Sequence, residues 1–277
     1  MIKARSFIRT PAFWDAQAPW QRAWLAHVPY HRRILQYLRA LVAPGWRVMD
    51  VGAGSGVLAL PLEEEGCEVV ALEPSRGMRA LLQEAARGRQ VARLTLDSRG
   101  LEDFPLAPPG AFDLILACNS LHLTTWGLGR SLERIFAAGP RHVCLVSEVG
   151  FLDTPLRARY GNFRLRRRAR WVADNSMAYH SLEEVWEHFR HRRGRRPTAT
   201  ERQELEAALV FEHHHFWLKQ EVQVALYWWS KSDTQGERRN GTERMPGWGL
   251  PGPAAGLGVA GGQGGGSPDH SAVISTG

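Results

Sequence analysis

The chain has 277 residues, 44% of them hydrophobic, which is enough for one sizeable folded core with appendages. No apolar run approaches the length of a membrane-spanning helix, and the basic N-terminus lacks the apolar core of a secretory signal. The formal net charge of +7 comes from basic residues of which only three are lysines, so the arginine excess indicates compositional bias as much as a binding surface. The three cysteines form no C-x-x-C pair, and we expect a cytoplasmic protein with reduced thiols and no membrane contact.

The first predicted element is a helical lead-in. Aromatic and aliphatic residues recur at three- and four-residue steps between positions 12 and 43, which is typical of an amphipathic helical segment. Pro44 and Gly45 would end it, so we expect residues 1–45 to precede the main domain. Four of its side chains either cover a bound ligand or simply pack on the core: Trp14, Asp15, Trp20 and Tyr30.

A glycine-rich turn follows the first predicted strand. The apolar run from Val48 ends in Asp50, three glycines then alternate from Gly52 to Gly56, and a helical pattern begins near Leu58. Glycine permits backbone angles closed to other residues and lets a ligand approach the main chain. The start of a helix also leaves N–H groups without a partner. This segment therefore predicts a strand, a tight turn and a cofactor at the start of a helix.

The residues around the turn favour a methyl donor over a dinucleotide. The dinucleotide fingerprint is G-x-G-x-x-G, whereas Val57 stands here at the third glycine position. A carboxylate at Asp50 would sit awkwardly beside a pyrophosphate but suits a cationic ligand without phosphate, such as S-adenosylmethionine. Glu73 ends the second predicted strand, where the two oxygens of a carboxylate can accept both ribose hydroxyl protons.

At this point residues 46–148 resemble the core of the class I S-adenosylmethionine-dependent methyltransferases, in the group that includes the ubiquinone and menaquinone C-methylases. The matching segments are Asp50–Gly56, Ala71–Ser75 with Met78, Phe112–Ala117, and Val143–Ser147. The resemblance implies an α/β fold, with a Rossmann-like seven-stranded sheet and helices on both faces. It also implies a cofactor site built from Asp50, Gly52, Ala53, Gly54, Gly56, Glu73, Pro74, Met78, Glu102, Asn119 and Ser120.

One residue of this implied site departs from the family pattern, and the roles of the residues after the fourth strand have alternatives. Glu102 resembles the acid that bonds the adenine amino group only loosely, because Gly100 stands where many relatives carry Asp. Asn119 and Ser120 follow the fourth strand, where ligands of open α/β sheets collect, and they would meet the methionine side of the cofactor or the acceptor. His122 is the candidate general base, with a packed or solvent-facing histidine as the alternative. A base is not obligatory, because the sulfonium leaves readily and alignment supplies much of the rate.

The arginine-rich segment 157–196 is the main ambiguity about the acceptor. It falls within an expected acceptor-side insertion over about residues 151–205, and positions 155–200 hold twelve arginines against four acidic residues. Either it contacts an anionic acceptor, which would be RNA or a carboxylated or phosphorylated metabolite, or it is a solvated face. Tyr160, Phe163 and Trp171 are interleaved with the arginines, as base stacking on RNA would require.

The remaining elements close the domain, which we expect to span residues 46–231. Ser181 and Glu184 match a capping box and predict a helix to about Phe189, with a second helix over 198–209. Residues 210–216 and 221–229 should pair as a hairpin at the sheet edge. His213 and His215 would share a face of the first strand, but no third ligand has a suitable spacing, so no metal site is predicted. Residues 232–277 hold 13 of the 28 glycines and predict a disordered tail.

The sequence thus predicts a transferase that passes a methyl group from S-adenosylmethionine to an acceptor by direct displacement. A small-molecule acceptor is favoured, because no recognisable RNA-binding module accompanies the arginines and the segment at Asn119 is not the Asn-Pro-Pro-Tyr of exocyclic-amine methylases. The alternatives are an RNA methyltransferase that uses segment 157–196, and a cofactor-binding protein without transfer activity.

Overall fold

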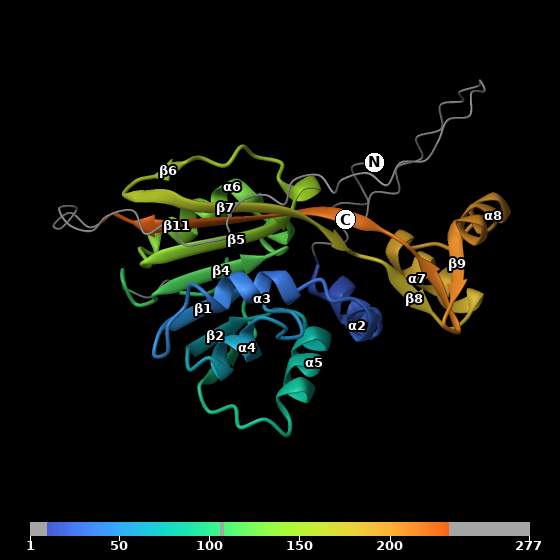
Figure 1. Ribbon diagram of the computed structural model, residues 1–277, viewed down its shortest axis with the longest axis horizontal. Coiled ribbons are helices and arrows are strands. Elements are labelled where there is room, and N and C mark those ends of the chain that lie inside the picture. Colours follow the sequence, from blue (N-terminus) through green and yellow to red (C-terminus); the bar gives the residue numbers. More distant parts are fainter. Residues whose placement is uncertain (1–9, 106–107, 233–277) are drawn as a thin grey trace, which may run out of the picture. The chain divides into compact units, whose positions relative to one another are not determined.

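The lead-in consists of two helices. The computed structural model, which describes residues 10–105 and 108–232, places α2 over Pro11–His27 and α3 over Arg32–Arg39 (Figure 1). The Thr10 hydroxyl caps α2 by accepting the Phe13 N–H at 3.2 Å. The helix stops at Val28, whose backbone is extended, because the residue before a proline avoids helical angles.

Strands and helices then alternate up to residue 148. They are β1 (Arg47–Val51), α4 (Ala59–Glu64), β2 (Glu68–Leu72), α5 (Arg76–Ala86), β3 (Leu94–Asp97), β4 (Leu114–Cys118), the 3₁₀ turn η1 (Leu121–Leu123), α6 (Gly127–Ala137) and β5 (His142–Glu148). The five strands are parallel in the order β3-β2-β1-β4-β5. This arrangement confirms the predicted Rossmann-like α/β fold.

Three antiparallel strands complete the large sheet beyond β5. After the 3₁₀ turn η2 (Val149–Phe151) they are β6 (Arg159–Tyr160), β7 (Phe163–Asp174) and β11 (Glu221–Lys231), and the order continues β5-β11-β7-β6. The sheet has eight strands where seven were predicted, and the addition is the two-residue β6, which folds back on the start of β7. Strand β11 lies between β5 and β7, which explains why its residues from Val224 to Trp229 are all buried.

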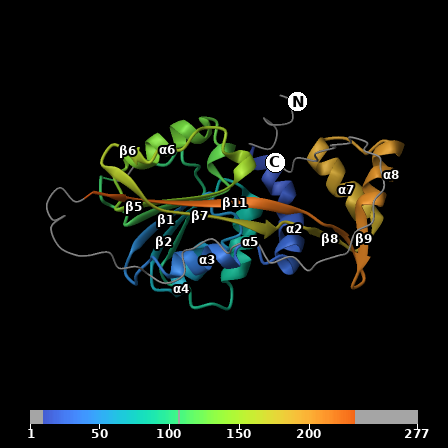
Figure 2. The ribbon, with the colours of Figure 1, turned by 45° about the horizontal axis from the view of Figure 1, so that its top comes forward.

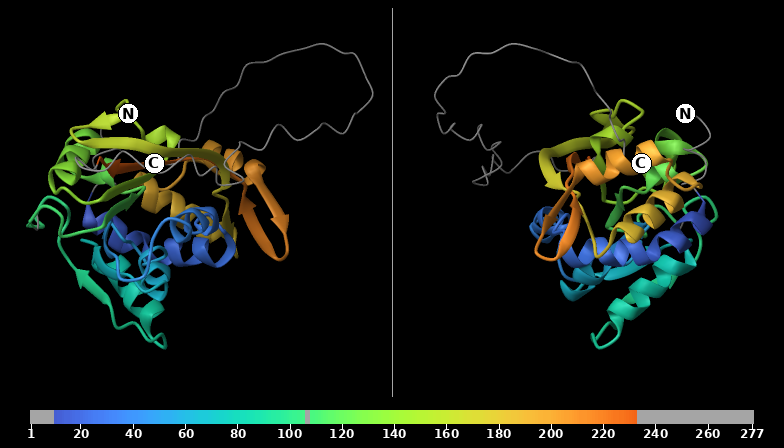
Figure 3. Two further views of the ribbon diagram at one scale, coloured as in Figure 1. Left: turned by 60° about the vertical axis from the view of Figure 1, so that its left-hand side comes forward. Right: turned by 90° about the vertical axis from the view of Figure 1, so that its right-hand side faces the viewer.

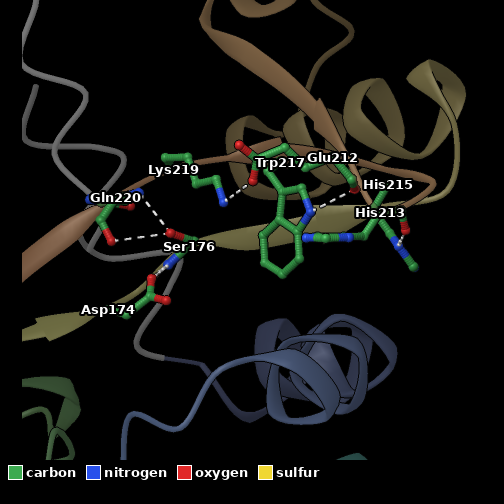
Figure 4. Close-up of polar contacts among 8 residues, drawn as sticks. All are labelled: Asp174, Ser176, Glu212, His213, His215, Trp217, Lys219 and Gln220. Atoms are coloured by element: carbon green, nitrogen blue, oxygen red, sulfur yellow. Dashed lines mark hydrogen bonds and ion pairs between the residues drawn. The ribbon is translucent and has the colours of Figure 1, made fainter.

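The predicted pairing of residues 210–216 with 221–229 is wrong. The chain reverses at His213 and His214, both with positive φ, so that β9 (Leu209–Glu212) pairs with β10 (His215–Leu218). Strand β8 (Met177–Tyr179) adds to β10 and completes a separate three-stranded sheet. Figure 3 shows the orange hairpin standing apart from the large sheet. Figure 4 shows Glu212 holding the hairpin together, through its carboxylate to Lys219 at 2.8 Å and its carbonyl to the Trp217 indole N–H at 3.2 Å.

Two helices accompany the small sheet. Helix α7 covers Leu182–Arg193 and so runs beyond the predicted end at Phe189, until Gly194 takes a left-handed conformation with φ 70°. Its start is capped by Ser181, although the Glu184 carboxylate accepts the His180 N–H instead of completing the predicted capping box. Helix α8 covers Ala199–Ala208 and carries a complete capping box at its start.

The large sheet has a hydrophobic core on each face. Helices α3 and α4 cover one face, with Ile34, Leu38 and Leu62 fully buried against the strands. Helix α6 covers the other face, and Figure 2 shows it on the opposite side of the strands from α3 and α4. A third cluster, centred on Tyr179 and Val185, packs the small sheet and α7 against Trp20 and Trp24 of α2.

Two further predictions concern membrane-spanning helices and the C-terminal tail. No helix in the described ranges is long and apolar enough to cross a membrane. The predicted tail, from residue 233 onward, lies outside the described residues.

Candidate functional site

The glycine turn is formed at the carboxyl end of β1 and crosses the end of β2. The backbone N–H groups of Gly52 and Ala53 both donate to the Leu72 carbonyl, at 2.8 and 2.9 Å. Gly52 has φ 73°, and a Cβ atom there would lie 2.5 Å from the Cβ of Ser120. Glycine is therefore required at this position both for its backbone angle and for the close approach of the chain after β4.

The other two glycines of the turn have different surroundings. A Cβ atom on Gly54 would meet no atom within 4 Å, so the backbone there faces open space. A Cβ atom on Gly56 would lie 2.7 Å from the Leu82 side chain of α5. Gly54 is thus the position where a ligand has room to lie against the main chain, while Gly56 allows α5 to pack closely.

Two buried carboxylates lie beside this turn. Glu73 is held by backbone groups, since its two carboxylate oxygens accept the N–H groups of Gly54 at 2.8 Å and Ser75 at 2.7 Å. Burial raises the pKa of Glu73, and these two hydrogen bonds oppose the rise. Burial, with a contribution from the Glu73 charge, raises the pKa of Asp50 to about 7. A ligand with positive charge would relieve both carboxylates, and each Glu73 oxygen keeps a lone pair for a hydroxyl group.

The residues that follow Glu73 join this site to the lead-in. The Ser75 hydroxyl caps α5 by accepting the Met78 N–H, and it donates to the Asp15 carboxylate at 2.6 Å. Asp15 also accepts the Gly77 N–H at 2.8 Å, and these hydrogen bonds lower its pKa. The Met78 side chain is buried, whereas Pro74 is exposed. Figures 1 and 3 show α2 and α5 side by side, so the lead-in lies directly against the candidate cofactor site.

Glu102 lies after β3 and contacts the loop that follows β4. Its carboxylate accepts the Thr125 N–H at 2.8 Å and the Thr125 hydroxyl at 3.2 Å. A Cβ atom on Gly100 would lie 3.1 Å from the same carboxylate. The Glu102 carboxylate therefore links the segment after β3 to the loop after β4.

Asn119 connects the ends of two strands with the lead-in. It has a left-handed backbone, with φ 50°, and its side-chain oxygen accepts the Glu148 N–H at 2.8 Å. Its amide nitrogen donates to the buried Tyr30 hydroxyl at 2.8 Å. The Ser120 hydroxyl donates to the Val51 carbonyl at the end of β1. These contacts bring the ends of β1, β4 and β5 together at one edge of the sheet.

His122 lies in the turn η1 at the same edge. Its ring is stacked on Phe151, with centroids 4.2 Å apart and an angle of 21° between the planes. The structure therefore gives the predicted base an aromatic partner, and its role in proton transfer stays a prediction.

Glu148 is a further residue at this edge of the sheet that was not among the predicted site residues. It is the last residue of β5, it is partly buried, and its backbone N–H donates to the Asn119 side chain. Burial raises the pKa of its carboxyl to about 7, and the positive charge of Arg192 opposes the rise. The signal was available, because Glu148 ends β5 as Asn119 follows β4, and ligands collect at the carboxyl ends of such strands.

The two arginine runs lie in different places. Arg166 and Arg167 of β7 line a cavity of about 520 Å³ with His142 and Trp46, which mark the amino ends of β5 and β1. Arg192, from the second run, lies instead near Glu148 at the carboxyl end of β5. A further cavity of about 510 Å³ lies between the lead-in, α4 and α5, and Ser55 and Gly56 of the glycine turn line it.

The histidine cluster takes part in the fold of the hairpin. His213 and His214 form the turn itself, and the His215 ring bonds to the His213 carbonyl at 2.9 Å (Figure 4). Within residues 10–105 and 108–232, no group of three or more His, Cys, Asp or Glu side chains is placed to hold a metal ion.

Known proteins resemble the part of the chain that builds this site. A family described as a methyltransferase domain matches residues 48–138. The ubiquinone biosynthesis O-methyltransferase of Xanthomonas campestris is 32% identical over 112 residues, which are 39% of this chain and 44% of that protein. An uncharacterized protein of Haemophilus influenzae is 29% identical over 157 residues, covering 55% of this chain and 57% of that protein. The chain thus spans about half the length of these curated relatives.

Among solved structures, the YcgJ protein from Bacillus subtilis is similar over 73% of this chain and 100% of its own, with 13% identity and a TM-score of 0.46. The matched residues 48–138 include the glycine turn and both buried carboxylates, whose charge and open surroundings at Gly54 fit a cationic cofactor. Residues 48–138 therefore carry a methyltransferase domain, and the cofactor of such domains is S-adenosylmethionine.

Proposed function

We propose that this protein is an enzyme that transfers a methyl group from S-adenosylmethionine to a small-molecule acceptor. The observation that carries the proposal is the pair of buried carboxylates, Asp50 and Glu73, beside the open backbone at Gly54. Two neighbouring buried acids are unfavourable without a positive charge near them. A ligand with sulfonium and amino groups supplies that charge.

Each part of the site has a proposed task. Glu73 accepts the ribose hydroxyl groups, Asp50 provides negative charge for the cationic end of the cofactor, and Gly54 leaves space for it. Asn119 and Ser120 border the methionine side and the acceptor. When bound, the cofactor supplies a methyl group on a positively charged sulfur, and the protein has to align the acceptor with that methyl carbon.

The choice of a small molecule rests on two observations. The relative from Xanthomonas campestris is named for ubiquinone biosynthesis, which concerns a small molecule. In addition, Arg166 and Arg167 lie beside Trp46 and His142, at the opposite ends of the strands from Asn119. An RNA held by these two arginines would therefore contact the end of the sheet opposite to Asn119.

Labelled cofactor tests the proposed function directly. We would incubate the protein with S-adenosylmethionine carrying a tritiated methyl group and with cell extract separated into RNA, protein and small molecules. The proposal predicts label in the small-molecule fraction. Label in RNA, together with RNA binding that weakens steeply with salt and on neutralising Arg166–Arg168, would replace it with RNA methylation. Tight cofactor binding without any transfer would indicate a non-catalytic protein.

A further inference from the structure

The outer edge of β7 is open along much of its length. Strand β11 pairs with the whole of β7, whereas β6 reaches only its first two residues on the other side. The Leu165 N–H also donates to the Ala158 carbonyl at 2.8 Å. From Arg168 to Ala173, β7 pairs with β11 alone among the residues that the structure describes (Figure 1). Six residues of a strand span about 20 Å, and their outward backbone groups can pair with a further strand.

Positive charge follows this open edge. The segment 154–173 contains seven arginines and no acidic residue. Trp171 and Ala173 are buried in the core that α3 covers, so the alternating Arg168 and Arg170 point to the opposite face, where both are exposed. Two side chains at this spacing lie about 6.8 Å apart. Within residues 10–105 and 108–232, neither arginine forms an ion pair with a carboxylate. The edge therefore carries a row of positive charge that an acidic strand would match.

The aromatic residues near these arginines are not arranged for base stacking. Phe163 and Trp171 are buried, and the Tyr160 ring is stacked on Phe136 with the centroids 4.3 Å apart. Single-stranded RNA is usually held by a basic groove together with aromatic side chains that stack on its bases. The exposed apolar residue on this part of β7 is Val172, which cannot stack. Unpaired backbone groups and alternating arginines are instead the features that an extended acidic peptide matches.

We propose that the edge of β7 from Arg168 to Ala173 binds an extended acidic segment of another protein, which adds a strand to the large sheet. This interaction is separate from the proposed methyl transfer. The backbone of the partner pairs with the outward N–H and C=O groups of β7. Acidic residues at every second position of the partner lie opposite Arg168 and Arg170, with Cβ atoms about 5 Å apart. The same arginines repel the edge of a second copy, so copies of this chain do not pair through β7.

Fluorescence anisotropy with the full chain tests the proposal. The probe is a labelled peptide that alternates Glu with Thr, because Thr favours strands. A second peptide alternates Lys with Thr. A third keeps the acidic residues of the first but carries proline at two central Thr positions, which removes backbone N–H groups. The double variant Arg168→Gln/Arg170→Gln removes the charge from the edge. Its matched control is Arg32→Gln/Arg87→Gln, at exposed positions in α3 and at the end of α5.

We expect the acidic peptide to bind, and the lysine and proline peptides to bind at least about tenfold more weakly. Arg168→Gln/Arg170→Gln should weaken binding of the acidic peptide by about fivefold or more, and the control by less than about twofold. Hydrogen exchange shows where the peptide binds. It should slow amide exchange between Arg168 and Ala173 and leave β3, at the other edge of the sheet, unchanged.

Several results would overturn the proposal. Equal binding of the proline peptide would rule out strand addition, and equal binding of the lysine peptide would rule out the charge pairing. Unchanged affinity in Arg168→Gln/Arg170→Gln, or exchange protection elsewhere, would reject this edge as the site. Oligouridine that binds more tightly than the acidic peptide, and depends on the same arginines, would replace the partner by RNA. If the double variant does not fold, the three peptides and the exchange pattern of the wild type decide. None of these measurements contains the cofactor, so their outcome is independent of the proposed methyl transfer.

Discussion

The buried carboxyl of Asp50 should lower the stability of the folded protein at neutral pH when no cofactor is bound. Its carboxyl is buried beside Glu73, and burial raises its pKa from 3.8 to about 7. The folded protein therefore holds this proton more tightly than the unfolded chain does. The stability that the bound proton provides is lost as the pH rises from about 4 to about 7.

Replacing Asp50 by Asn should stabilise the protein in the absence of cofactor at pH 8. The amide carries no charge to desolvate, so we expect a gain on the order of 2 kcal/mol at pH 8 and a much smaller one at pH 5. Thermal or denaturant unfolding at the two pH values measures the difference. Equal effects at both pH values would show that Asp50 does not titrate in this range.

Substitutions of Gly52 and Gly54 should have different effects on stability and on cofactor binding. Both have positive φ, so Ala strains the backbone at either position by a similar amount. Only at Gly52 would the new Cβ also collide with Ser120, and we expect Gly52→Ala to cost about 1–3 kcal/mol more. Gly54→Ala should instead weaken cofactor binding, because it fills the open space there. Urea unfolding and calorimetry of both variants test this, and Ser120→Gly should recover part of the Gly52→Ala loss.

At the scale of elements, α2 is fastened to α5 by close packing. A Cβ atom on Gly77 would lie 2.7 and 2.8 Å from the backbone of Asp15, and Asp15 bonds to Ser75 and Gly77. This contact places α2 beside Glu73, and Tyr30 continues the lead-in toward Asn119. The lead-in therefore contacts the candidate site at two places, through Asp15 and through Tyr30.

Gly77→Ala should therefore loosen α2 without unfolding the sheet. The clash involves backbone atoms and cannot be relieved by turning a side chain, so we expect faster proteolysis within residues 10–27 and several-fold weaker cofactor binding. Gly129→Ala on α6 is the matched control, because a Cβ atom there meets only Thr154, at 3.9 Å. Limited proteolysis followed by mass spectrometry reads out the cut sites. Equal protection of α2 in both variants would contradict this account.

Some elements were predictable because their signals are local. The strand, turn and helix around Gly52–Gly56 and the acid at Glu73 are set by short segments with strong conformational preferences. The hairpin at residues 209–218 was missed because His213 and His214 are unusual in a tight turn, where Asn and Gly are the common residues. The position of β11 between β5 and β7 depends on long-range pairing that its own alternating pattern cannot specify.

At the scale of the whole molecule, the site draws on segments far apart in sequence. In the proposed site, the lead-in would supply Asp15 and Tyr30, and the parallel strands would supply Asp50, Glu73, Asn119 and Glu148. His188 of α7 joins the small sheet to the lead-in, since its ring stacks on Trp20 and bonds to the Tyr179 hydroxyl at 2.8 Å. The sequence could place Glu148 at the end of β5, but the links from its backbone through Asn119 to Tyr30 are made only by the fold.

Removal of residues 233–277 should leave this assembly functional. The residues up to Ser232 form one compact unit with its own cores, and the composition of the segment beyond offers little apolar surface to bury. We expect the truncated protein to keep its melting temperature within about 2 °C, which corresponds to less than about 1 kcal/mol, and to keep its cofactor affinity. A large drop in either quantity would mean that the segment contributes to the folded unit.

The central claim, that a buried acid pair at the glycine turn binds S-adenosylmethionine, is tested most directly by calorimetric titration of this cofactor at pH 7 in two buffers of different ionisation enthalpy. Binding of a cation beside Asp50 should lower the pKa of that carboxyl, so we expect saturable binding with release of a fraction of a proton. The release should disappear in Asp50→Asn, with a marked loss of affinity. Binding without proton release, or with equal affinity in Asp50→Asn and Glu73→Gln, would contradict it.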